Sequence, residues 1–440
     1  MRMWRGVLGS AAVMASMALA APVVHAQGSP PARPFRALFG RDDTSRPARH
    51  ELNFTSSLSA AIDNNAQASP GANAPQPEDA GRSELYTAGA QLAYALRESW
   101  VTLNASGSAS YPYYSLVPEQ ADSPAYGGDI SLAFVPGDTT VSAYGRYSYS
   151  PYYAPFLQPG YVPSGGLFDY ASALSANELL SGGATLTHRL GRSTSASAGY
   201  YLSGTHFIDE DRTDGNQGVR VSMSGSVSRS VSLSGGYAYS RSRVADAAAS
   251  SRSESHGVDA SLGYSHQWSR SSATSLSGSI GWATVRYIDN SSDSWIGSVG
   301  VTHAIGSGWS VNANYGRTLQ YLNVSRQPTW DDSVSVGLNG RISQRVSVGV
   351  TGAYLRGRQV TGSDEGFDTY SGVAGVQVAL TTFMQASASY IYYRYNYPPD
   401  YDLPAGVPSR FDRQRVQFGM TFWLPLVHAG APRAPRGPAS

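Results

Sequence analysis

The chain contains no cysteine, no lysine and few charges of either sign. Charged residues make up 14% of 440 residues, and all basic residues are arginine. The absence of cysteine excludes disulfides and thiolate metal sites. The 32 basic and 31 acidic residues nearly cancel, which excludes the basic surface that nucleic-acid binding requires. We therefore expect no nucleic-acid partner, no metal and no other cofactor.

Long hydrophobic runs are also missing after the first residues. Arg2 and Arg5 precede an apolar run over 6–24, and small residues end the segment at Ala26. This order is typical of a secretory signal peptide, so we expect residues 1–26 to be removed; a membrane anchor is the less favoured alternative because no basic stop-transfer pattern follows. Residues 27–49 are rich in Pro and Arg and are expected to form an extended periplasmic leader.

What the chain has instead is alternation, clearest over residues 218–241. Apolar and small polar residues follow one another in the order GVRVSMSGSVSRSVSLSGGYAYSR. Side chains of a strand point alternately to its two faces, so one face is apolar and the other carries hydroxyls and glycine. Two strands of about ten residues around Arg229 and Ser230 make a hairpin, and ten tilted residues suffice to cross a bilayer.

The same hairpin recurs from residue 50 to residue 424. One strand, eight hairpins and a last strand add up to about 18 strands, with short turns alternating with long loops. This pattern predicts an all-β protein: a transmembrane antiparallel up-and-down β-barrel in the outer membrane of a Gram-negative cell, with short periplasmic turns and long extracellular loops. Residues 425–440 are expected to form a disordered periplasmic tail. A soluble sandwich or β-solenoid is the alternative.

Aromatic residues support the barrel because they fall near strand ends. A barrel in lipid carries aromatic girdles at both interfaces. Toward the long loops lie Tyr111, Tyr147, Tyr149, Tyr200, Tyr237, Tyr239, Trp282, Tyr315, Tyr354, Tyr390 and Tyr392; toward the short turns lie Tyr94, Trp100, Phe134, Trp268, Trp309, Phe383 and Trp423.

The second face of each strand carries mostly Ser, Thr, Gly, Asn and Gln. The candidate pore-lining residues on this face are Arg146, Arg220, Asp259, Arg341 and Gln377. Small side chains cannot fill a closed barrel of this size, so its middle is expected to hold water. No ring of one charge sign is present to select ions. These features predict a weakly selective pore for hydrophilic solutes.

One loop, 150–175, is the candidate constriction of this pore. Its aromatic side chains, which could stack on sugar rings, are Tyr152, Tyr153, Phe156, Tyr161, Phe168 and Tyr170. The favoured alternative is that they pack against one another and cap the barrel mouth.

Catalysis and calcium binding find little support. His206 is the only histidine with acids close by in sequence, at Asp209, Glu210 and Asp211; such a pair could activate water. The same acidic stretch resembles a calcium loop, but Gly215 stands at the seventh position instead of the sixth. We expect a solvated acidic loop and no enzyme.

The first strand ends in Ala60-Ala61-Ile62-Asp63-Asn64-Asn65 and enters a long loop, and many strands are rich in tyrosine. In these features the chain resembles the β-barrel porins associated with exopolysaccharide export. The resemblance implies a polysaccharide conduit whose leader meets periplasmic export components; a barrel with a blocked lumen is a third reading. Outer-membrane lipid, lipopolysaccharide and the barrel-assembly machinery are the general partners. A tail follows Phe422 and Trp423, so recognition by that machinery would use an internal signal.

Overall fold

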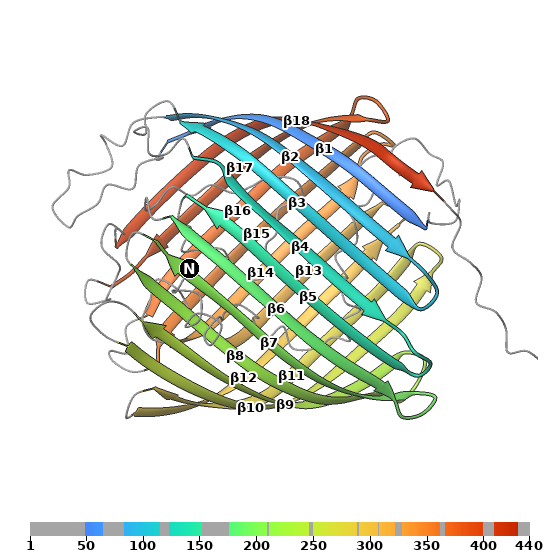
Figure 1. Cartoon of the computed structure of the whole chain (residues 1–440), viewed down its shortest axis with the longest axis vertical. Coiled ribbons are helices and arrows are strands. Elements are labelled where there is room, and N and C mark those ends of the chain that lie inside the picture. Colours follow the sequence, from blue (N-terminus) through green and yellow to red (C-terminus); the bar gives the residue numbers. More distant parts are fainter. Residues whose placement is uncertain are drawn as a thin grey trace, which may run out of the picture.

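Eighteen antiparallel strands in the described residues close into one barrel, which confirms the predicted fold (Figure 1). This computed structural model describes residues 49–64, 83–114, 123–151, 176–208, 211–245, 250–287, 290–306, 308–321, 328–360, 366–398 and 409–429. No helix in these ranges is long and apolar enough to cross a membrane, a criterion that does not apply to strands.

The strands follow the order of the chain around the barrel, and each pairs with its two sequence neighbours. Their bounds are β1 (His50–Asp63), β2 (Ser83–Arg97), β3 (Val101–Tyr114), β4 (Ala125–Phe134), β5 (Thr139–Ser150), β6 (Asn177–Arg189), β7 (Thr194–Phe207), β8 (Arg212–Ser226), β9 (Val231–Ala245), β10 (Ser250–Ser269), β11 (Ser272–Tyr287), β12 (Asn290–Ile305), β13 (Trp309–Tyr321), β14 (Pro328–Arg341), β15 (Val346–Gln359), β16 (Gly366–Ala379), β17 (Met384–Asn396) and β18 (Arg410–Ala429).

The apolar face of each strand points outward and the hydroxylic face points into the lumen. In the β8–β9 hairpin, Val221 and Met223 are more than half exposed on the outside. Ser222 and Ser224, on the other face, bond to serines of β7. The same alternation holds around the ring, so the exterior is a continuous apolar belt, as lipid requires.

The barrel closes between its first and last strands. His50 at the start of β1 pairs with Leu96 on one side and with Ala429 on the other. At the opposite end of this seam, Asp63 and Arg413 form a buried ion pair, with Nε at 2.6 Å from Oδ2. The chain therefore enters and leaves the barrel at the rim that carries the short turns, on the right in Figure 1.

Two boundaries differ from the expected ones. β18 runs to Ala429, so the strand continues past residue 424, where the tail was expected to begin. The connections at the other rim are also shorter than expected in one sector. Residues 208–211 join β7 to β8, residues 246–249 join β9 to β10, and residues 288–289 join β11 to β12. There the polar residues assigned to loops continue the strands beyond the apolar belt.

The aromatic residues predicted to lie near the strand ends flank the belt at both rims, with Trp423 as the exception. Trp100 and Phe134 pack edge to face at the short-turn rim, and Tyr354 and Tyr370 lie 4.9 Å apart at the other. Trp423 is only 6% exposed and stacks on Phe383. Trp423 follows the outward-pointing Phe422 in β18, so its side chain points toward the barrel interior. It therefore does not belong to the aromatic girdle at the short-turn rim.

Candidate functional site

Solvent reaches the inner wall at β4 and β5. Tyr144 and Arg146 occupy inward positions of β5, and Tyr144 is 49% exposed. The Tyr144 ring lies over Gly183 of β6, where an added Cβ would come within 2.8 Å of it. Arg146 stands directly opposite Asp129, which accepts a 2.6 Å hydrogen bond from Ser106. The wall here offers both charge signs to the lumen.

Pairs of serine hydroxyls line the wall from β7 to β12. Cross-strand bonds join Ser195 to Ser224 (2.9 Å), Ser197 to Ser222 (2.7 Å), Ser234 to Ser261 (2.6 Å) and Ser279 to Ser298 (2.8 Å). Each hydroxyl can both donate and accept, so these pairs are satisfied without any charge. This side of the lumen is therefore polar and neutral.

Two of the predicted pore residues neutralise each other. Arg220 of β8 donates through Nη2 to both carboxylate oxygens of Asp259 on β10, at 2.7 and 2.8 Å. The bond spans the intervening strand β9 because Gly236 lies beneath it; a Cβ at Gly236 would be 3.0 Å from Nη2. This pair adds no net charge to the lumen.

The other predicted residues stand apart from it. Arg341 lies at the short-turn end of β14, and Gln377 of β16 faces Ser347 and Ser387 across its two neighbours. All five positions lie on the inner face, but only Arg220 and Asp259 come together. The aromatic loop residues Tyr152, Tyr153, Phe156, Tyr161, Phe168 and Tyr170 lie outside the described residues, so their role stays a prediction.

A constriction that the sequence did not reveal begins where β12 and β13 separate. Their pairing extends only to Gly297 and Arg317, although β12 begins at Asn290 and β13 continues to Tyr321. Beyond this point β13 stays paired with β14 alone. The wall is therefore split at the long-loop rim between two strands that adjoin in sequence.

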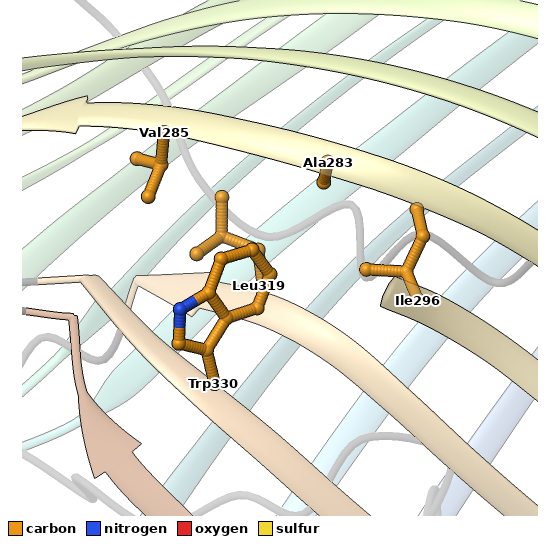
Figure 2. Close-up of a cluster of buried hydrophobic side chains, with 5 residues drawn as sticks. All are labelled: Ala283, Val285, Ile296, Leu319 and Trp330. Carbon is orange, nitrogen blue, oxygen red and sulfur yellow. The ribbon is translucent and has the colours of Figure 1, made fainter. Parts of the chain in front are cut away.

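A buried apolar cluster shows where the ends of β13 and β14, which are not paired with β12, lie in the barrel (Figure 2). Ala283, Val285 and Ile296 occupy inner-face positions of β11 and β12, whereas Leu319 and Trp330 continue the outer-face positions of β13 and β14. All five side chains are at most 8% exposed. An outer face can meet an inner face only if the ends of β13 and β14 lie inside the wall of β11 and β12.

Hydrogen bonds fix this overlap. Trp330 donates through Nε1 to Ser292 Oγ at 3.2 Å, and Arg317 donates to Ser294 Oγ at 3.3 Å. The ends of β13 and β14 therefore narrow the barrel mouth. Ala283 and Val285 are apolar on an inner face that is mostly polar, but Leu355 and Ile391 are apolar on that face as well, so this departure does not by itself locate the constriction.

The lumen side of the overlapped strand carries a buried acid, Asp331. Its side chain is 1% exposed, and neither carboxylate oxygen has a hydrogen-bond partner among the described residues. Asp331 lies beyond Val334, the last residue of β14 that is exposed on the apolar belt, and hence outside the membrane-spanning part. Burial raises the pKa of Asp331 to about 7; the nearby Thr329 side chain acts in the opposite direction, and repulsion from Asp332 adds a smaller increase. The barrel mouth thus holds a carboxyl group that titrates near neutral pH.

The acidic loop expected after His206 is partly a strand. Arg212 begins β8 and forms a buried ion pair with Asp214 at 3.1 Å, while His206 Nδ1 bonds to Thr213 Oγ1 at 3.2 Å. Asp209 and Glu210 lie outside the described residues. Within the described ranges, no cluster of three potential metal ligands occurs.

Known proteins resemble this chain only at low sequence identity. No family model matches the chain, and no curated protein matches it. Crystal structures similar to it include Pseudomonas aeruginosa OpdQ (11% identity, 86% of this chain and 99% of that chain, TM-score 0.48), Acinetobacter baumannii OccAB3 (10%, 85% and 99%, 0.47) and the outer membrane protein OprD from P. aeruginosa (9%, 88% and 97%, 0.45). At such identities and scores, the function must be argued from the chain's own residues, and those describe an 18-stranded transmembrane barrel.

Proposed function

We propose that the chain forms a weakly selective, water-filled pore for hydrophilic solutes in the outer membrane. The observation that carries this proposal is the division of the barrel into an apolar exterior and a hydroxylic interior. The exposed Tyr144 and the serine pairs indicate a lumen wall in contact with water. Because Arg220 is paired with Asp259, the inner charges favour neither cations nor anions strongly.

The overlap at the long-loop rim supports a limit on solute size. Leu319 and Trp330 hold the ends of β13 and β14 inside the wall, so the mouth is narrower than the barrel beneath it. The same overlap is the observation that favours the competing reading, a barrel whose lumen is blocked. Open and blocked barrels differ in conductance.

Planar-bilayer recording of the refolded full-length protein tests the proposal. We expect stepwise channels with weak preference for either ion of a KCl gradient, and reduced current when neutral sugars of increasing size are added. Heat-modifiable gel migration establishes that the barrel is folded. Folded protein without channels above background would support the blocked barrel and overturn the pore.

Export of a polysaccharide is the more specific function that the resemblance implies. The Asp-Asn pair at the end of the first strand, on which the resemblance rests, also has a structural role. Asp63 pairs with Arg413 at the seam, and Asn64 Oδ1 accepts a 2.7 Å hydrogen bond from the Gln414 backbone. Closing the barrel is therefore sufficient reason for this Asp-Asn pair. Block of the channel current by a long anionic polysaccharide, but not by dextran of equal size, would favour export over general permeation.

We further propose that the short turns face the periplasm. The chain enters and leaves the barrel at that rim, at His50 and Ala429, and short turns on the periplasmic side are the rule for such barrels. The leader 27–49 would then be available to periplasmic components. Cysteine labelling at Arg229→Cys with a reagent that cannot cross the outer membrane should fail in whole cells and succeed after permeabilisation.

A further inference from the structure

On the outer face of the barrel, the aromatic girdle at the long-loop rim shows a repeated pattern of hydrogen bonds. A girdle tyrosine donates its hydroxyl hydrogen to an acid or amide on its own or an adjacent strand. The pairs are Tyr86–Glu84 (2.9 Å), Tyr147–Glu178 (3.1 Å), Tyr200–Gln217 (3.1 Å), Tyr315–Asp332 (2.8 Å), Tyr354–Asp368 (2.6 Å), Tyr390–Gln414 (3.3 Å) and Tyr392–Asp412 (3.3 Å).

Outward arginines on the later strands are balanced by these acids. Arg356 of β15 stands opposite Asp332 on one side and Asp368 on the other. Arg394 of β17 stands opposite Asp412. Arg356 and Arg394 thus each have an acid directly across the sheet, which is the favourable arrangement for neighbouring strands, whereas Arg358 and Arg410, nearer the rim, face no acid.

The sector of β9, β10 and β11 departs from this rule. Its outer face carries Arg241, Arg243, Arg252 and Arg286, and Arg243 stands directly opposite Arg252. Two like charges in that position destabilise a sheet, and both side chains are exposed to solvent. The local arrangement leaves positive charge that the strands themselves do not neutralise.

Two acids in this sector offset only part of the charge. Glu254 stands between Arg241 and Arg286 and bonds to Arg252; this hydrogen bond and the surrounding arginines lower the pKa of the Glu254 carboxyl. Asp293 lies on β12, opposite Thr284. Among the residues that the structure describes in this sector, four arginines against two acids leave an excess of two positive charges.

The surface below the four arginines is suited to lipid. The next outward position contains His256, whose Nδ1 bonds to Tyr237 Oη at 2.8 Å and whose ring lies 5.0 Å from Tyr239. Val258 and Leu262 follow on the apolar belt and are about half exposed. Positive charge, aromatic rings and aliphatic side chains thus succeed one another along β10 from the rim toward the middle.

We propose that the arginine sector, formed by Arg241, Arg243, Arg252 and Arg286, binds the phosphorylated headgroup of an outer-leaflet glycolipid. Guanidinium groups bind phosphate through paired, charge-assisted hydrogen bonds. A bound phosphate between Arg243 and Arg252 removes their mutual repulsion, and the acyl chains of the same molecule lie on the belt below. This inference rests on the proposed outer-membrane location but not on conduction, because none of the four side chains faces the lumen.

Binding of bisphosphorylated lipid A tests the proposal, with the dephosphorylated lipid as comparison. The full-length barrel, refolded in detergent, is titrated with each lipid, and bound copies are counted by native mass spectrometry. The test variant combines Arg243→Gln, Arg252→Gln and Arg286→Gln. The control combines Arg192→Gln, Arg229→Gln and Arg270→Gln, three exposed arginines at the opposite rim, and changes the net charge equally.

We expect wild type and control to prefer phosphorylated lipid A, and the test variant to bind it at least about tenfold more weakly, as loss of one good charged contact would cause. Equal binding by test and control variants would overturn the proposal, as would equal binding of the two lipids. Displacement of the lipid by inorganic phosphate would show a soluble-anion site instead. Heat-modifiable migration checks that each variant is folded, and an unchanged conductance in the test variant separates this result from the pore proposal.

Discussion

Arg220 reaches across a whole strand to Asp259, and Gly236 is the residue that lets it pass. The Asp259 side chain is almost buried, so it depends on this one cation for compensation. Arg220→Gln should leave a negative charge on the lumen wall, shift the reversal potential in a KCl gradient toward cation preference and lower the free energy of unfolding by about 1–3 kcal/mol.

The double variant Arg220→Gln with Asp259→Asn is the control for that change. It removes both charges and should return the reversal potential to the wild-type value. A cation preference that persists in the double variant would mean that other residues set the selectivity.

Trp330 fastens the overlapped hairpin. Trp330→Ala removes the largest side chain of the cluster and the hydrogen bond to Ser292; loss of a buried tryptophan costs about 3–5 kcal/mol. We expect larger single-channel conductance, because the ends of β13 and β14 are released from the wall, together with lower stability toward urea. Trp268→Ala, at an exposed position of the opposite girdle, should leave the conductance unchanged. A larger conductance in both variants would contradict the assignment.

Asp331 should make the barrel sensitive to pH. Its pKa in the folded protein, about 7, lies above the ordinary value of 3.8, so the fold favours the neutral carboxyl. The stability that this preference provides is fully present below about pH 4 and is lost as the pH rises to about 7, because only between these two pKa values does the folded state hold a proton that the unfolded state has released. Wild type should therefore lose stability to urea between about pH 4 and 7 relative to Asp331→Asn, which lacks this titration, and should be the less stable of the two proteins above about pH 7. Parallel profiles for the two proteins would refute this.

The hydroxyl of Tyr354 should contribute measurably to stability. It donates to Asp368 at 2.6 Å, whereas Tyr370, whose ring lies 4.9 Å away, provides a matched position on the same girdle. Tyr354→Phe should lower the free energy of unfolding in lipid vesicles by about 1.5–3 kcal/mol, the range for a hydrogen bond to a charged group. Tyr370→Phe should change it by less; equal losses would assign the effect to the interface and not to the bond with Asp368.

Most of the fold was predictable because membrane strands obey one simple rule. Val219 and Val221 must meet lipid while Ser222 meets water, and this requirement, repeated along the chain, determines the faces, the strand count and the position of the short turns. Strand ends were less predictable. Residues such as Thr213 and Asn216 are polar enough for a loop, yet they pair with β9 once the preceding part of the hairpin holds them in register.

The constriction was not predictable from alternation. Leu319 and Trp330 keep the outward phase that the sequence assigns to them, and only the curvature of the sheet brings that face against Ile296. Likewise, the sequence shows Arg220 and Asp259 as separate charges. That they meet across β9 depends on which inward residues lie side by side around the ring, and this register is a property of the closed barrel.

The ion pair between Asp63 and Arg413 joins residues 350 positions apart in the chain. Until β18 has been added, the growing sheet has two unpaired edges, and exposed edges are where strands aggregate. No subset of hairpins can bury its backbone polar groups in lipid, since a membrane accepts only a closed ring of strands. Insertion is therefore an all-or-none event that waits for the last strand, and a ribosome that stops before residue 410 yields a chain with no stable place in the bilayer.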